Sequence, residues 1–290
     1  MELTEEIRRK VLEFQRTEIT EHHIYMRLAK TINSPENAKI LEQIGTDELR
    51  HYDELKKYSQ VDVQPDWFRV WWYYLISRTF GYTFGIKLME QGEEQVQNSY
   101  SQVAAVIPDA ARLQHEEDEH EEKLIGMLSE ERLQYAGSIV LGLNDALVEL
   151  TGALAGLTLA LQNTKLIALS GLITGIAASM SMAASEYLST RSEDTARKPA
   201  RAAIYTGIAY IITVALLVLP YLLFESYYLD LAITLTTAVC IIALFNYYVS
   251  VAKGGSFRER FLEMAGLSLS VAMLSFIIGY FIRQWLGINI

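Results

Sequence analysis

The stretch Glu48-Leu-Arg-His51 recurs further along the chain as Glu117-Asp-Glu-His120. Side chains three positions apart share one face of a helix, so each copy presents a carboxylate and an imidazole to one point. One Glu-x-x-His in a charged helix is a weak signal, because such helices often face solvent. Two copies on alternate helices, with glutamates on the helices between them, are typical of a four-helix bundle that holds two metal ions.

Apolar residues at helical spacing predict four helices in this half of the chain. Thr4 is a suitable N-cap for the first helix, because acidic residues follow it in the first turn. Pro35, Pro65 and Pro108 mark the breaks between helices. The predicted helices cover about residues 4–32, 35–58, 66–107 and 109–129.

The first and third of these helices offer the remaining carboxylates of such a site. Glu18 lies on the inward stripe of the first helix. Glu90 and Glu93 both lie on the inward stripe of the third helix, and Glu94 lies at the edge of that stripe. Periodicity therefore leaves open which of the three glutamates binds metal.

Over about residues 5–130 these motifs resemble the rubrerythrin branch of the ferritin-like superfamily. The resemblance implies a di-iron centre bridged by Glu48 and Glu117, and oxygen and imidazole ligands also suit manganese. The ligands that it implies are Glu18, Glu48, His51, Glu90, Glu93, Glu117 and His120. Other acids nearby belong either to a solvated surface or to an accessory cation site. The accessory candidates are Glu21, Glu94, Glu116 and Glu121.

An unusually aromatic segment, Trp67 to Tyr74, contains three tryptophans and two tyrosines. Two interpretations remain open for it. The segment packs against another helix or a second subunit, or it contacts the membrane–water interface, where Trp and Tyr concentrate.

The two halves of the 290-residue chain differ sharply in charge. Residues 1–135 have a net charge of −10 and hold all five histidines, whereas the remainder has a net charge of zero. An acidic, histidine-bearing half followed by an apolar half suggests a cation-binding domain on a membrane anchor. It argues against nucleic acid as a partner, because phosphate binding requires clustered Lys and Arg.

The second half contains five apolar stretches long enough to cross a bilayer. They cover about Ala136–Leu161, Leu166–Leu188, Ala203–Phe224, Leu229–Ala252 and Leu262–Ile282. One side of these stretches has seven basic loop residues, namely Arg191, Arg197, Lys198, Arg201, Lys253, Arg258 and Arg260. The other side has only Lys165 and Arg283, with Glu225 and Asp230 in a connection. The positive-inside rule therefore predicts a cytoplasmic N-terminal domain.

The first apolar stretch carries two carboxylates, Asp145 and Glu149, one helical turn apart on the same face. A central Asp costs about 2.5–3.5 kcal/mol on membrane-insertion scales, and an intramembrane acid is a functional candidate by default. The second stretch adds Met180, Met182 and Glu186. Methionines are more often packing residues than ligands, but two of them near carboxylates favour a path for a transition metal.

Residues 133–290 resemble the vacuolar iron transporter family. The similar segments are Gly-Leu-Asn144-Asp145-Ala and Ser-Met182-Ala-Ala-Ser-Glu186-Tyr-Leu-Ser. The resemblance implies a dimer in which the matching Asp and Met line the cation path, and iron or manganese leaves the cytoplasm in exchange for protons. The family's glutamate-rich segment between spans two and three is missing here, since Thr190 to Ala202 is short and net basic.

The expected fold is therefore all-α: a ferritin-like four-helix bundle at residues 1–132, then a five-helix transmembrane domain at 133–290, an arrangement similar to prokaryotic membrane-bound ferritin-like iron exporters. The expected function is export of Fe²⁺, or of Mn²⁺, by a homodimer in the cell membrane. The alternative is a membrane-tethered ferroxidase or a peroxide-scavenging, rubrerythrin-like oxidoreductase. Cys240, the single cysteine, cannot build the Cys₄ iron centre that rubrerythrins usually pair with their di-iron site.

Overall fold

The computed structural model describes residues 4–89, 91, 110–126, 135–193 and 197–287. Every regular element in these ranges is helical, and none of them contains a strand. The chain divides into two compact units, Met1–Glu130 and Glu131–Ile290. Each unit is built around its own apolar core.

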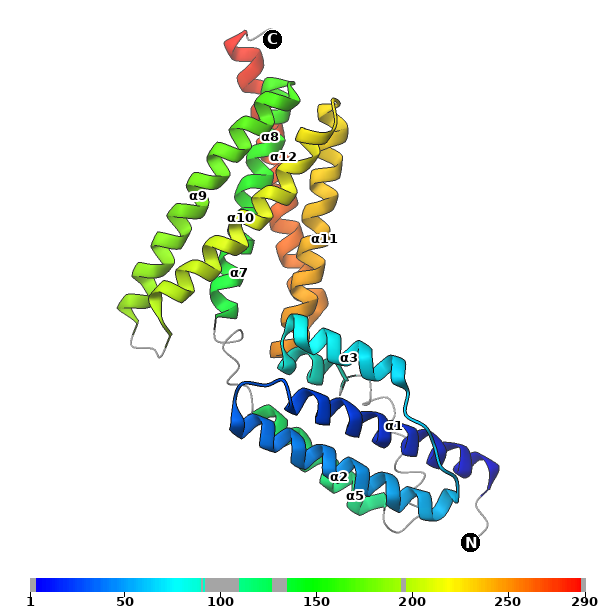
Figure 1. Cartoon of the computed structure of the whole chain (residues 1–290). Helices are drawn as coiled ribbons and strands as arrows, with labels where there is room; N and C mark the ends of the chain where they lie inside the picture. Colours follow the sequence, from blue (N-terminus) through cyan, green and yellow to red (C-terminus); the bar gives the residue numbers. More distant parts are fainter. Residues whose placement is uncertain (1–3, 90, 92–109, 127–134, 194–196, 288–290) are drawn as a thin grey trace. The chain divides into compact units, whose positions relative to one another are not determined.

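Two long helices, α1 (Glu5–Ala29) and α2 (Pro35–Ser59), lie side by side in the first unit (Figure 1). The predicted N-cap is confirmed, since the Thr4 side chain accepts a hydrogen bond from Ile7 N. Ser34 caps α2 in the same way, with Pro35 at the first helical position, where its missing N–H is not needed. The buried stripes that join the two helices include Phe14, Ile24, Leu28, Leu41 and Ile44.

The prediction of one long helix over residues 66–107 is wrong. Helix α3 (Trp67–Phe80) ends at Gly81, which has a φ of +104°, and a new helical segment covers residues 82–89. The new segment approaches α3 closely, because a Cβ placed on Gly85 would lie 1.9 Å from Ser77 Oγ. A continuous helix cannot make this contact, so both glycines are required for the chain to turn back on α3.

One face of α3 is aromatic and largely exposed, although Arg27 of α1 lies over the Trp67 and Trp71 rings. Trp67, Phe68, Trp71 and Trp72 are exposed, Phe68 to 76%. Tyr73 and Tyr74 instead pack against the core of the unit. The aromatic segment is thus divided between two faces of one helix, one packed against the core of the unit and the other largely exposed.

The last described helix of the first unit is α5 (Ala110–Gly126), which contacts α2. Its buried side chains include Leu113, His120 and Leu124. The predicted range of 109–129 agrees with α5 where the structure describes it.

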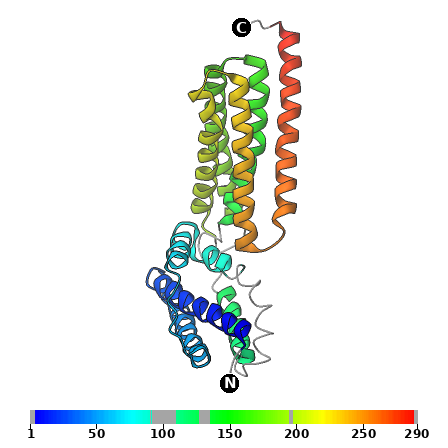
Figure 2. The same cartoon turned by 90° about the vertical axis from the view of Figure 1, so that its right-hand side faces the viewer.

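The structure of the second unit confirms the prediction of five helices that are long and apolar enough to cross a membrane. Figure 2 shows them packed lengthwise against one another. The first span consists of α7 (Ala136–Asp145), a π-helical segment (Ala146–Leu150) and α8 (Thr151–Leu161). The others are α9 (Thr164–Ser192), α10 (Pro199–Leu223), α11 (Tyr227–Lys253) and α12 (Phe257–Leu286).

Glycines bring the membrane helices into close contact. A Cβ on Gly142 of α7 would lie 2.5 Å from the carbonyl oxygen of Thr206 on α10. A Cβ on Gly279 of α12 would lie 2.2 Å from the carbonyl oxygen of Gly156 on α8. Small residues at such positions let backbones approach and pack, as is usual in membrane helices.

Candidate metal centres

Four side chains from three helices converge in the first unit. Glu18 comes from α1, Glu48 and His51 from α2, and Glu117 from α5, and one ligand atom of each lies within 4.8 Å of all the others. Glu18, Glu48 and His51 are buried, and Glu117 is half-buried. Carboxylate and imidazole ligands gathered in this way fit iron or manganese.

Both motif histidines direct Nδ1 toward the same two carboxylates. His51 Nδ1 lies 2.9 Å from Glu117 Oε1 and 3.5 Å from Glu48 Oε2. His120 Nδ1 lies 3.3 Å from Glu48 Oε1 and 3.7 Å from Glu117 Oε2. The two rings are stacked with their centroids 5.8 Å apart. Glu48 and Glu117 therefore each contact both imidazoles.

The outer nitrogen of each imidazole contacts an acid on the other helix. His51 Nε2 lies 2.8 Å from Glu116 Oε2, and His120 Nε2 lies 3.3 Å from Asp47 Oδ2. Such outer carboxylates fix the tautomer and the orientation of a metal-binding imidazole. Asp47 is not among the predicted site residues, although a signal for it exists: an acid directly precedes each Glu-x-x-His, as Asp47 before Glu48 and Glu116 before Glu117.

The accessory candidates separate into different environments. Glu116 contacts Arg50 and Arg112 at 2.8 and 2.7 Å, so two guanidinium groups offset its charge while it contacts His51. Glu21 is buried on α1. Glu90, Glu93, Glu94 and the side chain of Glu121 lie outside the described residues.

Burial and pairing together set the protonation of this centre. Burial raises the pKa of Glu18 well above its ordinary value, although a hydrogen bond with His51 opposes the shift. Burial would also raise the pKa of Glu48, but hydrogen bonds from His120 and His51 outweigh it and lower the pKa to about 2. Burial by itself would lower the pKa of His120, whereas hydrogen bonds to Glu117 and Glu48 raise it to about 10. The two imidazolium groups therefore offset the acids when no metal is bound.

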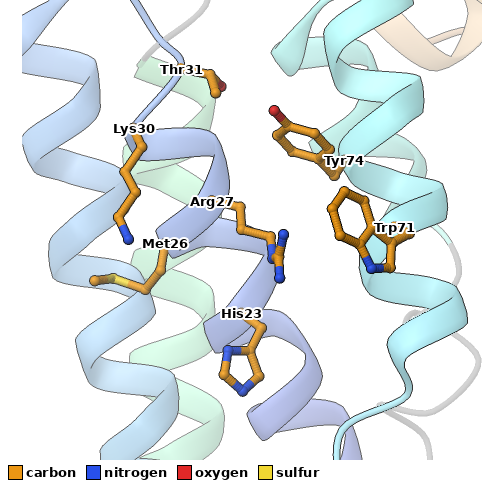
Figure 3. A pocket seen from close by; sticks show the side chains of 7 residues that line it. All are labelled: His23, Met26, Arg27, Lys30, Thr31, Trp71 and Tyr74. Carbon is orange, nitrogen blue, oxygen red and sulfur yellow. The ribbon is translucent and has the colours of Figure 1, made fainter.

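A separate pocket of about 450 Å³ lies between α1 and α3 (Figure 3). Its lining is cationic and aromatic, and comprises His23, Met26, Arg27, Lys30, Thr31, Trp71 and Tyr74. Arg27 lies over the Trp71 ring, with Cζ 4.4 Å from its centroid. No carboxylate is among these lining residues, so the pocket differs in chemistry from the acidic centre.

The second unit places its two predicted span-one acids at a break in the α-helix. Asp145 is the last residue of α7, and Glu149 lies in the π-helical segment that follows. Asp145 is half-buried and Glu149 is exposed in the single chain. The Tyr210 hydroxyl of α10 donates a hydrogen bond to Glu149 Oε2 at 3.2 Å. A π-segment inside an α-helix frequently marks a functional site, and no pattern in the sequence indicates it.

Glu186 is buried, and one of its carboxylate oxygens has several partners. Ser138 Oγ donates to Glu186 Oε1 at 2.5 Å, Thr190 donates to the same oxygen at 3.3 Å, and Arg197 lies 3.8 Å away. These contacts are enough to hold a charged carboxylate in place. Ser138 precedes Asp145 by seven residues, or about 10 Å along the helix.

The two predicted methionines of α9 differ in environment. Met182 is half-buried and packs against the apolar core of the second unit, whereas Met180 is 70% exposed on the outer surface of this single chain. Of these two methionines, therefore, only Met182 faces the other spans in the described part of one chain.

A cavity of about 390 Å³ adjoins the first span between α7, α11 and α12. Its lining includes Asn144, Asn246 and Met264, and Asn246 Nδ2 lies 3.3 Å from Met264 Sδ. Asn144 Oδ1 is buried without a hydrogen-bond partner among the described residues. The cavity is thus lined by one unsatisfied polar atom, Asn144 Oδ1, on the residue directly before Asp145.

The five spans define the chain as an integral membrane protein. The chain also carries a VIT family domain, since the profile of that family matches residues 136–198, which include the first two spans, Asp145, Glu149, Met182 and Glu186. This match indicates transport of a metal, iron or manganese, across the membrane. No curated protein and no solved structure matches the chain.

Proposed function

We propose that this protein exports Fe²⁺, with Mn²⁺ as a second substrate, from the cytoplasm in exchange for protons. The observation that carries the proposal is the pair Asp145 and Glu149, which lies inside the VIT family match at a π-helical break. Divalent cations of this kind accept carboxylate oxygens as ligands.

The exchange follows from the chemistry of carboxylates in a membrane. An isolated charged acid is costly there, so Asp145 and Glu149 are occupied either by a metal ion or by protons. When the acids open to the proton-rich side, protons displace the metal, and deprotonation on the other side restores the metal site. Tyr210 donates to Glu149 and keeps this acid oriented when the metal has left.

The first unit would act as the metal-capturing domain, built as a ferritin-like di-iron bundle. The four converging ligands Glu18, Glu48, His51 and Glu117, with His120 beside them, fit iron in donor type and would hold it. A bound iron pair would supply one-electron redox chemistry. The chain's own residues would bind and orient it: Glu48 and Glu117 between the imidazoles, and Asp47 and Glu116 behind them.

The proposed setting is the cell membrane, with the first unit in the cytoplasm and two chains forming the transporter. The orientation rests on the seven basic residues of the two loops on one side of the spans. The homodimer is supported by the exposure of Met180 and Glu149 in the single chain, since a second copy would bury side chains of this kind.

The test is metal flux into proteoliposomes that contain the full chain and a metal-sensitive dye, with an imposed pH gradient. We expect Asp145→Asn to reduce the Fe²⁺ flux at least about a hundredfold, because the neutral amide cannot exchange a proton for the metal. Glu259→Gln is the matched control, since Glu259 is an exposed acid in the first turn of α12. Undiminished flux in Asp145→Asn would rule out the mechanism.

A second candidate function is ferroxidase activity in the first unit, favoured by the converging ligands around Glu48. In that reaction each Fe²⁺ loses one electron to dioxygen or peroxide, which the medium supplies. We expect His51→Ala in the full chain to abolish rapid formation of Fe³⁺ and His115→Ala, an exposed histidine on α5, to leave it unchanged. Equal rates in the two variants would exclude this activity.

A further inference from the structure

An apolar stripe runs along the exposed side of α3. Positions 68, 71, 72 and 75 lie on one side of a helix that has 3.6 residues per turn. They hold Phe68, Trp71, Trp72 and Leu75, whose exposures are 76, 54, 51 and 59%. Val70 and Ser77, on the opposite side of α3, are buried. The helix therefore packs one side into its own unit and presents a second apolar side to its surroundings.

The charge around this stripe is positive, unlike that of the first unit as a whole. Residues 67–89 contain three cations, Arg69, Arg78 and Lys87, and no acid, whereas residues 1–135 contain 26 acids. Arg69 and Arg78 are nine positions apart, or two and a half turns, so they flank the stripe on opposite sides. Among the described residues, no acid lies within 4.0 Å of either guanidinium. Apolar side chains flanked by long cationic ones are typical of a helix at a membrane surface.

The pocket between α1 and α3 adjoins the stripe, because Trp71 belongs to both. Figure 3 shows the Arg27 side chain directed toward Trp71. Arg27 Cζ lies 4.4 Å from the centroid of the Trp71 ring and 5.7 Å from that of Trp67, and no acid in the described part of the chain lies within 4.0 Å of its guanidinium. Stacking holds the plane of a guanidinium and leaves its N–H groups able to donate to a phosphate. The volume of about 450 Å³ has room for such a group.

An anionic phospholipid leaflet matches this surface in charge and in polarity. Its phosphates would neutralise the unpaired guanidinium groups, and Trp and Tyr side chains concentrate at the level of its headgroups. The chain itself supplies such a partner, since the first unit ends at Glu130 and a membrane span begins at Ala136. A second copy matches less well. A two-fold contact uses the same patch on both chains, so the flanking arginines would approach one another.

We propose that α3 docks the first unit on an anionic phospholipid leaflet. Phe68, Trp72 and Leu75 enter the boundary between headgroups and acyl chains. The guanidinium groups of Arg27, Arg69 and Arg78 bind lipid phosphates. Docking of this kind requires only that the chain carries membrane spans, and it does not depend on metal transport.

Tryptophan fluorescence of the full chain, one copy per nanodisc, measures how deeply α3 enters the lipid. The chain has four tryptophans, and the background variant Trp285→Phe leaves only the three of α3. We expect phosphatidylglycerol that is brominated near the headgroup end of its acyl chains to quench these tryptophans. Phe68→Asp should reduce the quenching at least about threefold, because a charged side chain opposes insertion. Val61→Asp is the matched control, since Val61 is an exposed apolar residue of the same unit outside α3, and it should leave the quenching unchanged.

The flanking arginines allow a second measurement. We expect Arg78→Gln to lower the ratio of docked to undocked chains about fivefold, which is the contribution of one cation near an anionic leaflet. Lys39→Gln removes the same charge from an exposed position on α2 and should have no effect. In nanodiscs of brominated phosphatidylcholine alone, docking should be weaker and the difference between Arg78→Gln and the background variant should disappear.

Three results would overturn the proposal. The first is quenching that is absent, or that is equal in Phe68→Asp and the background variant. The second is burial of the α3 tryptophans only in nanodiscs that hold two chains, which would identify a second copy as the occupant. The third is protection from aqueous acrylamide by inorganic phosphate in uncharged detergent that equals protection by the leaflet, which would assign the pocket to a free anion. All measurements are made without metal, so failure of this proposal and failure of the transport mechanism are distinguishable.

Discussion

The two units carry acids in opposite electrostatic settings. In the first unit, each central carboxylate contacts imidazoles, and two more acids and two arginines lie behind them. In the second unit, Glu149 contacts a tyrosine hydroxyl, and neither oxygen of the buried Asp230 has a hydrogen-bond partner among the described residues. Glu186 is the exception, because it lies beside Arg197.

The two settings suit different tasks: the setting in the first unit favours retention of a metal ion, and that in the second favours its passage. Imidazole ligands held by outer acids are oriented before the metal arrives, which favours tight binding. Oxygen ligands without such support bind less tightly and exchange faster, which suits transport. The comparison predicts that substitutions in the first unit change affinity and that substitutions in the second unit change flux.

The largest effect is expected for Glu48→Ala. Glu48 is the buried acid that contacts both imidazoles, so its removal should weaken metal binding by the first unit at least about a hundredfold. Isothermal titration of the full chain with Mn²⁺ measures this affinity. Flux through proteoliposomes loaded with saturating metal should remain within about twofold of wild type. Equal losses of affinity and flux would contradict the separation of the two units.

The outer acids should have an intermediate effect. We expect Asp47→Asn and Glu116→Gln each to weaken Mn²⁺ binding by about 10–100-fold, because each amide holds its imidazole less firmly. Glu119→Gln is the control on the same helix as Glu116, since Glu119 is exposed and pairs only with His115 and Lys123 among the described residues. If the control loses as much affinity, the effect reflects total charge and not orientation of the histidines.

Much of this arrangement could be predicted from the sequence because length and periodicity determine it. The five spans follow from apolar stretches that must cross a bilayer, and their observed ends differ from the predicted ones by a few residues. Thr4 can be identified as a cap because capping depends on local chemistry. The convergence of Glu48, His51 and Glu117 follows from a spacing of three on neighbouring helices.

Other features could not be predicted, because they depend on tertiary contacts. The helix break at Gly81 interrupts an apolar pattern that would also suit a continuous helix, and the π-segment at Ala146–Leu150 has no compositional signature. The sequence alone groups Asp230 with the connection, although the expected span, Leu229–Ala252, already begins one residue before it. The observed helix begins at Tyr227, and Asp230 is the buried residue of its first turn.

The close contact between α7 and α10 in the second unit can be tested by substituting a glycine. Gly142→Ala would place a Cβ 2.5 Å from Thr206 O and should separate α7 from α10, at a cost of about 1–3 kcal/mol in the free energy of unfolding. Gly137→Ala on the same helix is the control, since no described atom lies within 4 Å of the position that its Cβ would take. Thermal unfolding in detergent measures the difference. An equal shift in both variants would show that helix propensity and not contact with α10 is responsible.

The smallest effect is expected for Tyr210→Phe, which removes one hydrogen bond to Glu149 and keeps the ring in its buried place. A hydrogen bond to a charged group contributes about 1.5–3 kcal/mol, but Glu149 is exposed in the single chain, so the loss should lie near the lower end. We expect the Fe²⁺ flux to fall about tenfold while Mn²⁺ binding by the first unit stays unchanged. If the hydroxyl only stabilised the fold, Tyr210→Phe would lower the unfolding temperature and leave the flux per folded chain intact. A reduced flux with an unchanged unfolding temperature therefore identifies Tyr210 as a residue that positions the span-one acid.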